Sequence, residues 1–172
     1  MNDLKRFRAQ CEKLLRELTI PNPFEITTFC DSVSERRGKP MILTPAQMTP
    51  TAESCPYGLW VGFDHVDRIY YEQDTSPLHR DAIILHEVSH MLLGHSSDVA
   101  DALSLSGILP DLDPGKVRHW LSRRIYTTDN ELQAELLSSL ILERASVSPP
   151  HSGSWVTRLS NAWQRPSQTP RD

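Results

Sequence analysis

The feature that most restricts the fold of this chain is residues 86–90, His-Glu-Val-Ser-His, an H-E-x-x-H box inside an apolar segment. Residues four apart lie one turn above each other on an α-helix, so His86 and His90 present their imidazoles from one face. That geometry suits two nitrogen ligands on one zinc ion, with Glu87 beside them to accept a proton from the attacking water. The alternative is a partly buried helix that carries two histidines by chance.

The residues around the box predict a buried helix over residues 77–94. Ser76 is a typical N-cap, and Pro77 fits the first helical position, where its missing N–H costs nothing. Gly94 is placed to end the helix. Apolar residues on nearly all sides indicate burial, and ionisable side chains in a buried helix need a partner. A divalent metal ion would be such a partner.

The third ligand decides the class of metal site. A metzincin places a glycine seven and a histidine ten positions after the first ligand, whereas Gly94 and His95 follow His86 by eight and nine positions. His95 would also lie about 180° around a continued helix from His86. We therefore predict that His95 is a cap or surface residue, and that a carboxylate from a later helix completes a His2Glu site.

That later helix is predicted over residues 128–145, where Glu131 and Glu135 share one stripe with small residues. We predict Glu131 as the metal ligand and Glu135 as the acceptor for the free N–H of a ligating histidine. The alternative is that Thr128 and Glu131 form a capping box, which would leave Glu135 as the ligand.

With these motifs, the chain resembles the ImmA/IrrE family of metallopeptidases. The resemblance rests on the block from His86 to His95, on the stretch Glu131-Leu132-Gln133-Ala134-Glu135 and on the hairpin-like segment 58–72, and it covers about residues 5–145. It implies a gluzincin-type zinc protease with the third-ligand pattern E-x-E-A-(D/N)-x-F-A. Here Gln133 replaces the second Glu, Glu135 the Asp or Asn, and Leu137 the Phe.

The remaining pattern predicts a single α+β metallopeptidase domain over residues 1–146, with a small antiparallel sheet packed beside the zinc helix. An apolar stripe predicts a helix over residues 2–19, and Asn22-Pro23 predicts the start of a second helix that ends at Arg37. Three strands are expected at residues 41–44, 59–63 and 68–72, and a short helix is expected over residues 117–125. The Pro/Ser-rich residues 147–172 read as a tail that contains a short amphipathic helix at 155–163.

Length, charge and cysteine content restrict the class of protein and its expected compartment. The chain has 172 residues, which suits one core, and its formal net charge of −4 argues against direct nucleic-acid binding. No apolar run is long enough to span a membrane, and the N-terminus lacks a signal-peptide core. Three cysteines without metal-ligand spacing indicate buried thiols in a reducing compartment, so we expect a cytoplasmic protein.

The expected function is zinc-dependent cleavage of an intracellular protein. His86, His90 and Glu131 would hold Zn²⁺, Glu87 would act as general base, and Tyr126 and His119 are candidate oxyanion donors on sequence position alone. The resemblance implies a protein substrate such as a helix-turn-helix transcriptional repressor. The competing hypothesis is a non-proteolytic, zinc-stabilised module that binds a regulator or toxin, and a metal-free helical protein is the third.

Overall fold

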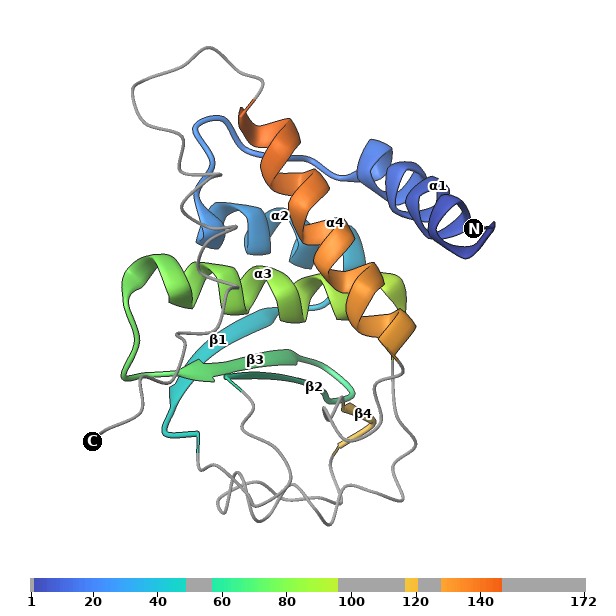
Figure 1. Ribbon diagram of the computed structural model, residues 1–172. Helices are drawn as coiled ribbons and strands as arrows, with labels where there is room; N and C mark the ends of the chain where they lie inside the picture. The colour runs from blue at the N-terminus through green and yellow to red at the C-terminus, as the bar shows by residue number, and fades with distance from the viewer. Residues whose placement is uncertain (1, 49–56, 96–116, 121–127, 147–172) are drawn as a thin grey trace, which may run out of the picture.

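The computed structural model describes residues 2–48, 57–95, 117–120 and 128–146 and shows an α+β protein. Figure 1 labels its helices and strands. In chain order they are α1 (Asn2–Glu17), α2 (Ile26–Arg37), β1 (Met41–Ala46), β2 (Gly58–Gly62), β3 (Asp67–Glu72), α3 (Pro77–Leu93), β4 (His119–Trp120) and α4 (Thr128–Ser146). The predicted helices and strands of the scaffold are therefore present, with ends that differ by a few residues.

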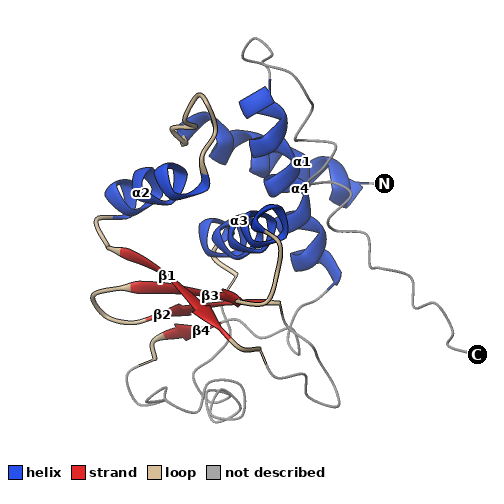
Figure 2. Ribbon diagram, turned by 90° about the vertical axis from the view of Figure 1, so that its left-hand side faces the viewer, coloured by secondary structure: helices blue, strands red, loops and turns tan. Residues whose placement is uncertain are grey.

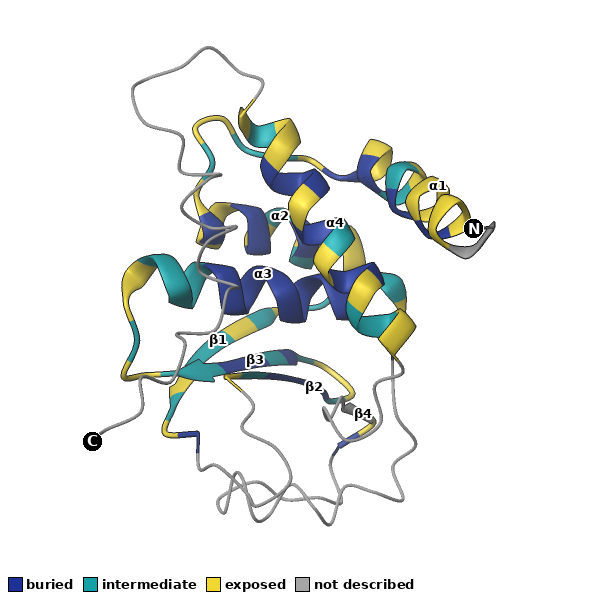
Figure 3. Ribbon diagram, viewed as in Figure 1, coloured by how far each residue is buried: buried dark blue, intermediate teal, exposed yellow. Residues whose placement is uncertain are grey.

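The helices gather on one face of the sheet, with α3 between the strands and the other helices (Figure 2). Helix α3 packs against β2 and β3 on one side and against α2 and α4 on the other, and α1 packs against α4. Its middle is buried throughout, whereas α1 and α4 each keep an exposed face (Figure 3). The H-E-x-x-H box thus lies on the central element of the core, as its apolar surroundings predict.

The sheet is mixed, so the prediction of an antiparallel sheet is wrong in this respect. Its order is β1-β3-β2-β4, in which β2 and β3 form an antiparallel hairpin and β4 pairs antiparallel with β2. Strand β1 pairs parallel with β3, from Met41 opposite Asp67 to Ala46 opposite Glu72. The alternation of side chains along a strand is the same in either direction, so residue patterns identified the strands but could not assign the direction of β1.

Helix α2 begins later than the sequence predicts. Its N-cap is Glu25, whose carboxylate accepts hydrogen bonds from the backbone N–H groups of Thr27 and Thr28. The Asn22-Pro23 pair lies before the helix, so the prediction of a start there is wrong. The C-terminal prediction is confirmed: Gly38 follows the last helical residue in the left-handed conformation, with φ 63°.

A buried carboxylate joins α2 and the start of β1 to the hairpin. Asp67 is fully buried, and its oxygens lie 3.1 Å from Arg37 on α2 and 3.1 Å from Lys39 just before β1. It also accepts a hydrogen bond of 3.2 Å from the indole N–H of Trp60 on β2. This network fixes β2, one of the two strands that pack against α3, relative to the helices.

Two further predictions concern the C-terminal half of the chain. A short helix was predicted over residues 117–125, but the structure has strand β4 at His119–Trp120, paired with β2, so that prediction is wrong for these residues. The tail and its predicted helix at 155–163 lie outside the described residues. Among the residues described, no helix is long and apolar enough to cross a membrane.

Candidate metal centre

Helix α3 begins and ends where the sequence predicts. The Ser76 side chain caps it by accepting a hydrogen bond from His79 N, Pro77 occupies the first turn, and Gly94 ends it in the left-handed conformation with φ 72°. Ten successive residues, 82–91, are buried, and they include the whole box. The predicted helix over residues 77–94 is therefore confirmed, as is its burial.

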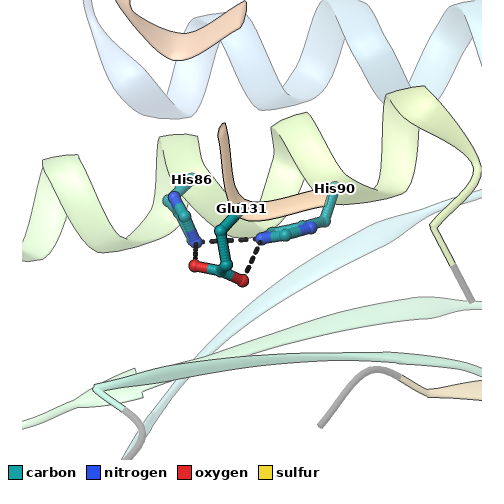
Figure 4. Close-up of side chains that lie close together, drawn as sticks. All are labelled: His86, His90 and Glu131. Atoms are coloured by element: carbon teal, nitrogen blue, oxygen red, sulfur yellow. Dashed lines mark hydrogen bonds and ion pairs between the residues drawn. The ribbon is translucent and has the colours of Figure 1, made fainter. Parts of the chain in front are cut away.

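His86, His90 and Glu131 converge on one point, with the two imidazoles from α3 and the carboxylate from α4 (Figure 4). The Nε2 atoms of His86 and His90 lie 2.9 Å apart. Glu131 Oε2 lies 3.5 Å from His86 Nε2, and Glu131 Oε1 lies 3.4 Å from His90 Nε2. Tetrahedral coordination with bonds of about 2.0–2.1 Å separates ligand atoms by about 3.3 Å, so the two imidazole–carboxylate spacings fit a metal site and the Nε2–Nε2 spacing is somewhat shorter.

The electrostatics of the group also suit a metal ion. Burial lowers the pKa of His90 to about 4, so its imidazole is neutral at neutral pH. Burial alone would raise the pKa of Glu131, but the neighbouring imidazoles of His86 and His90 together lower it. Neutral imidazole and ionised carboxylate are the forms that bind metals. Glu131 Oε1 is buried without a hydrogen-bond donor of good geometry, and a cation would satisfy it.

Close packing of α4 on α3 places Glu131. Ser89 Oγ and Ser138 Oγ are hydrogen-bonded at 2.9 Å across the two helices, and Ala134 beside them is fully buried. Small side chains let the two backbones approach closely enough for a glutamate one turn earlier to reach the histidines. The structure therefore brings together the three residues predicted as ligands, which could bind a metal ion.

Glu135 does not lie where we predicted. It is exposed on α4, and no hydrogen bond among the described residues joins it to His86 or His90. The geometric reason is that the buried face of α4 is centred near Ala134 and Leu137. At 100° per residue, Glu131 lies about 60° from Ala134, whereas Glu135 lies about 100° away on the same side. Glu131 therefore reaches the two histidines from the edge of that face, and Glu135 points away from them.

Glu87, the predicted base, is held at the boundary between α3 and the sheet. Its Oε2 accepts a hydrogen bond of 3.1 Å from the backbone N–H of Trp60 on β2. Gly58, also on β2, lies so close that an added Cβ would be 2.9 Å from Glu87 Oε1. The Trp60 side chain itself is buried in the core.

His95 is not a surface residue, so that half of the prediction is wrong, but its backbone N–H does cap α3 by donating to His90 O at 3.1 Å. Its side chain is only 9% exposed, and its Nδ1 lies 3.0 Å from Nδ1 of His90, the nitrogen opposite the one that faces the metal group. The side chain of Gln133 on α4 lies beside this imidazole, and its interaction with His95 opposes the lowering of the His95 pKa by burial. The estimate of 180° assumed a continued helix, but the left-handed Gly94 ends α3 and turns His95 back toward His90. Gly94 directly before a histidine is the signal that could have indicated this.

The two candidate oxyanion donors cannot be placed against the site. Tyr126 lies outside the described residues. The backbone of His119 belongs to β4, opposite Gly62 of β2, but the position of its side chain is not described. Both remain predictions.

Comparison of the chain with protein-family models, with curated proteins and with solved structures finds no match. The observations at this site are therefore geometric and chemical: a buried His-His-Glu group that could hold a metal ion, with a carboxylate next to the first histidine. The resemblance to the ImmA/IrrE family stays a prediction from sequence.

Proposed function

We propose that this protein is a zinc-dependent endopeptidase that cleaves another protein. The observation that carries the proposal is the convergence of His86, His90 and Glu131 next to a buried glutamate, Glu87, on the same helix. Two imidazoles and one carboxylate are a common donor set for catalytic zinc, which keeps its fourth position open. Structural zinc sites instead use four protein ligands, predominantly cysteine.

The chemistry divides between the ion and the chain. When bound, zinc acts as a Lewis acid that makes water a stronger nucleophile and polarises a peptide carbonyl. Glu87 accepts the proton of the attacking water and returns it to the leaving amine. The Trp60 N–H holds one carboxylate oxygen of Glu87, which fixes the orientation of the other.

The substrate proposal rests on the sequence resemblance to the ImmA/IrrE family. On that basis the substrate is an intracellular protein, with a helix-turn-helix repressor as the candidate, and the enzyme acts in the cytoplasm on protein rather than on nucleic acid. The net charge of −4 argues against direct binding to nucleic acid.

One observation favours a second function, a zinc-stabilised module that binds a regulator or toxin without cleaving it. The hydrogen bond from Trp60 N to Glu87 gives this glutamate a structural task, because it joins α3 to β2. A buried backbone N–H needs an acceptor whether or not the protein is an enzyme. The presence of Glu87 alone therefore does not separate the two functions.

Metal analysis and proteolysis with two variants separate them. We expect one zinc per wild-type chain after dialysis and a large loss of zinc in His86→Ala. Glu87→Gln keeps an amide oxygen for Trp60 N but removes the base, so its zinc content should match wild type. New N-termini that wild-type protein generates in a cell lysate, counted by mass spectrometry, should form about 10²–10⁴-fold more slowly with Glu87→Gln.

Each outcome decides between the hypotheses. A wild-type protein that binds no zinc when titrated would contradict both functions. Zinc binding without any cleavage, or with equal cleavage by wild type and Glu87→Gln, would contradict the endopeptidase and support the binding module.

A further inference from the structure

His95 and Gln133 lie directly behind a metal-ligand histidine, and neither was predicted to contribute to the site. His90 is completely buried, so its Nδ1 has no access to solvent. The described atom that faces this nitrogen at hydrogen-bonding distance is Nδ1 of His95, at 3.0 Å. The backbone fixes the contact as well, since His95 N donates to His90 O at 3.1 Å.

The protonation of this pair follows from metal binding. A neutral imidazole carries one proton, so a His90 that presents the Nε2 lone pair to a metal must carry its proton on Nδ1. That N–H then donates to His95 Nδ1, which has to be an unprotonated acceptor. His95 in turn carries its proton on Nε2 and can donate it to the side-chain oxygen of Gln133, which lies beside this imidazole.

We propose that His95 and Gln133 are positioning residues, which form a neutral hydrogen-bond relay that fixes the tautomer and orientation of His90 at the metal. The inference rests on the proposed zinc site. Metal-binding histidines commonly donate their second N–H to a carboxylate, a backbone carbonyl or water. Here a second histidine takes that place and an amide terminates the relay, so no negative charge is added behind the ligand.

Gln133 stands where the ImmA/IrrE third-ligand pattern has its second glutamate, and an amide at this position agrees with the proposed relay. Gln133 on α4 is only 9% exposed, and its backbone carbonyl faces the Cys11 thiol on α1. A buried glutamate at this position would need a compensating positive charge, whereas an amide needs only hydrogen bonds. The relay is therefore compatible with its buried surroundings.

The first test uses zinc affinity, measured by competition with a fluorescent chelator on the full chain. His95→Leu removes the acceptor for His90, and we expect zinc binding about 10–100-fold weaker at an unchanged stoichiometry of one. His95→Gln offers an amide oxygen and should recover most of the affinity, and Gln133→Leu should give an intermediate loss. The control is His65→Leu, which removes an exposed histidine from the β2–β3 turn and should bind zinc as wild type does.

The second test needs no variant. Long-range ¹H–¹⁵N NMR of the zinc-loaded wild-type protein should show His90 protonated on Nδ1 and His95 protonated on Nε2. The relay is overturned if His95 carries its proton on Nδ1, or if His95→Leu folds and binds zinc as tightly as wild type. Failure of the wild-type protein itself to bind zinc would instead overturn the proposed function, and the two failures are therefore distinguishable.

Discussion

A methyl group added at Gly58 tests how closely strand β2 must approach helix α3, which carries the two histidines. A Cβ at this position would lie 2.5 Å from Cγ2 of Ile83 and 2.9 Å from Cγ and Oε1 of Glu87. Both neighbours are buried side chains of α3, so neither can move freely aside. Gly58→Ala should therefore push the strand and the helix apart at the predicted base.

The magnitude follows from two opposing effects. Adding a methyl group to a packed core costs about 1–3 kcal/mol. Gly58 has no positive φ, so alanine fits the backbone, and the reduced freedom of the unfolded chain favours alanine by about 0.4–1 kcal/mol. We expect a net destabilisation of about 1 kcal/mol, which lowers Tm by about 2–4 °C for a chain of this size.

Urea unfolding of the metal-free protein measures this effect, and a double-mutant cycle assigns it. Ile83→Leu removes the Cγ2 methyl, so Gly58→Ala should cost less in that background than in the wild type. Gly58→Ala should also impair proteolysis, because its Cβ would displace Glu87. That contact remains in the double variant, so proteolysis should stay impaired even where stability recovers. The reasoning is refuted if Gly58→Ala is at least as stable as wild type, or if Ile83→Leu leaves its cost unchanged.

Three further predictions concern the site and its helix. Glu131→Gln should abolish stoichiometric zinc binding, whereas the matched change Glu135→Gln on the exposed face should leave it intact; equal losses in a chelator competition would contradict the geometry. In the metal-free protein, His90 has a pKa of about 4 against 6.5 for an unperturbed imidazole, so the unfolded state takes up the proton first as pH falls. The free energy of unfolding should therefore fall between pH 6.5 and 4 and be constant above that range, and urea midpoints that rise on acidification would show the opposite sign. Ser76→Ala should remove the cap of α3 and cost about 1 kcal/mol, with Thr75→Ala as a neighbouring control that leaves thermal unfolding unchanged.

The sequence predicted those features of the fold that depend on interactions between residues close together in the chain. The limits of α3 were predictable because Ser76, Pro77 and Gly94 act within one turn of the helix ends. Glu131 could also be predicted as the third member of the group, because small residues on the same helix indicate where another backbone comes close. The direction of β1 was not, since strand direction depends on the path of the chain between elements rather than on residue periodicity.

The surroundings of His90 were harder to predict, for a different reason. Helical angles placed His95 on the far side only while the helix continued, and a single left-handed residue, Gly94, reverses that conclusion. Gln133 lies on the buried face of α4, about 160° around the helix from Glu131, so the stripe that contains the ligand does not include it. Side chains behind a ligand are set by how two helices and a turn meet, which one helical stripe cannot show.

The sequence and the structure each give Glu87 a different candidate role. Its position in the sequence indicates a base, and its hydrogen bond to Trp60 N shows that it also joins α3 to β2. If the structural task were the whole role, glutamine would serve as well, because its amide oxygen can accept the same hydrogen bond. If Glu87 is the base, glutamine keeps the fold and the zinc but cannot accept a proton. Comparing wild type with Glu87→Gln therefore separates an endopeptidase from a zinc-stabilised binding module. His86→Ala cannot separate them, because it removes the metal that both functions need.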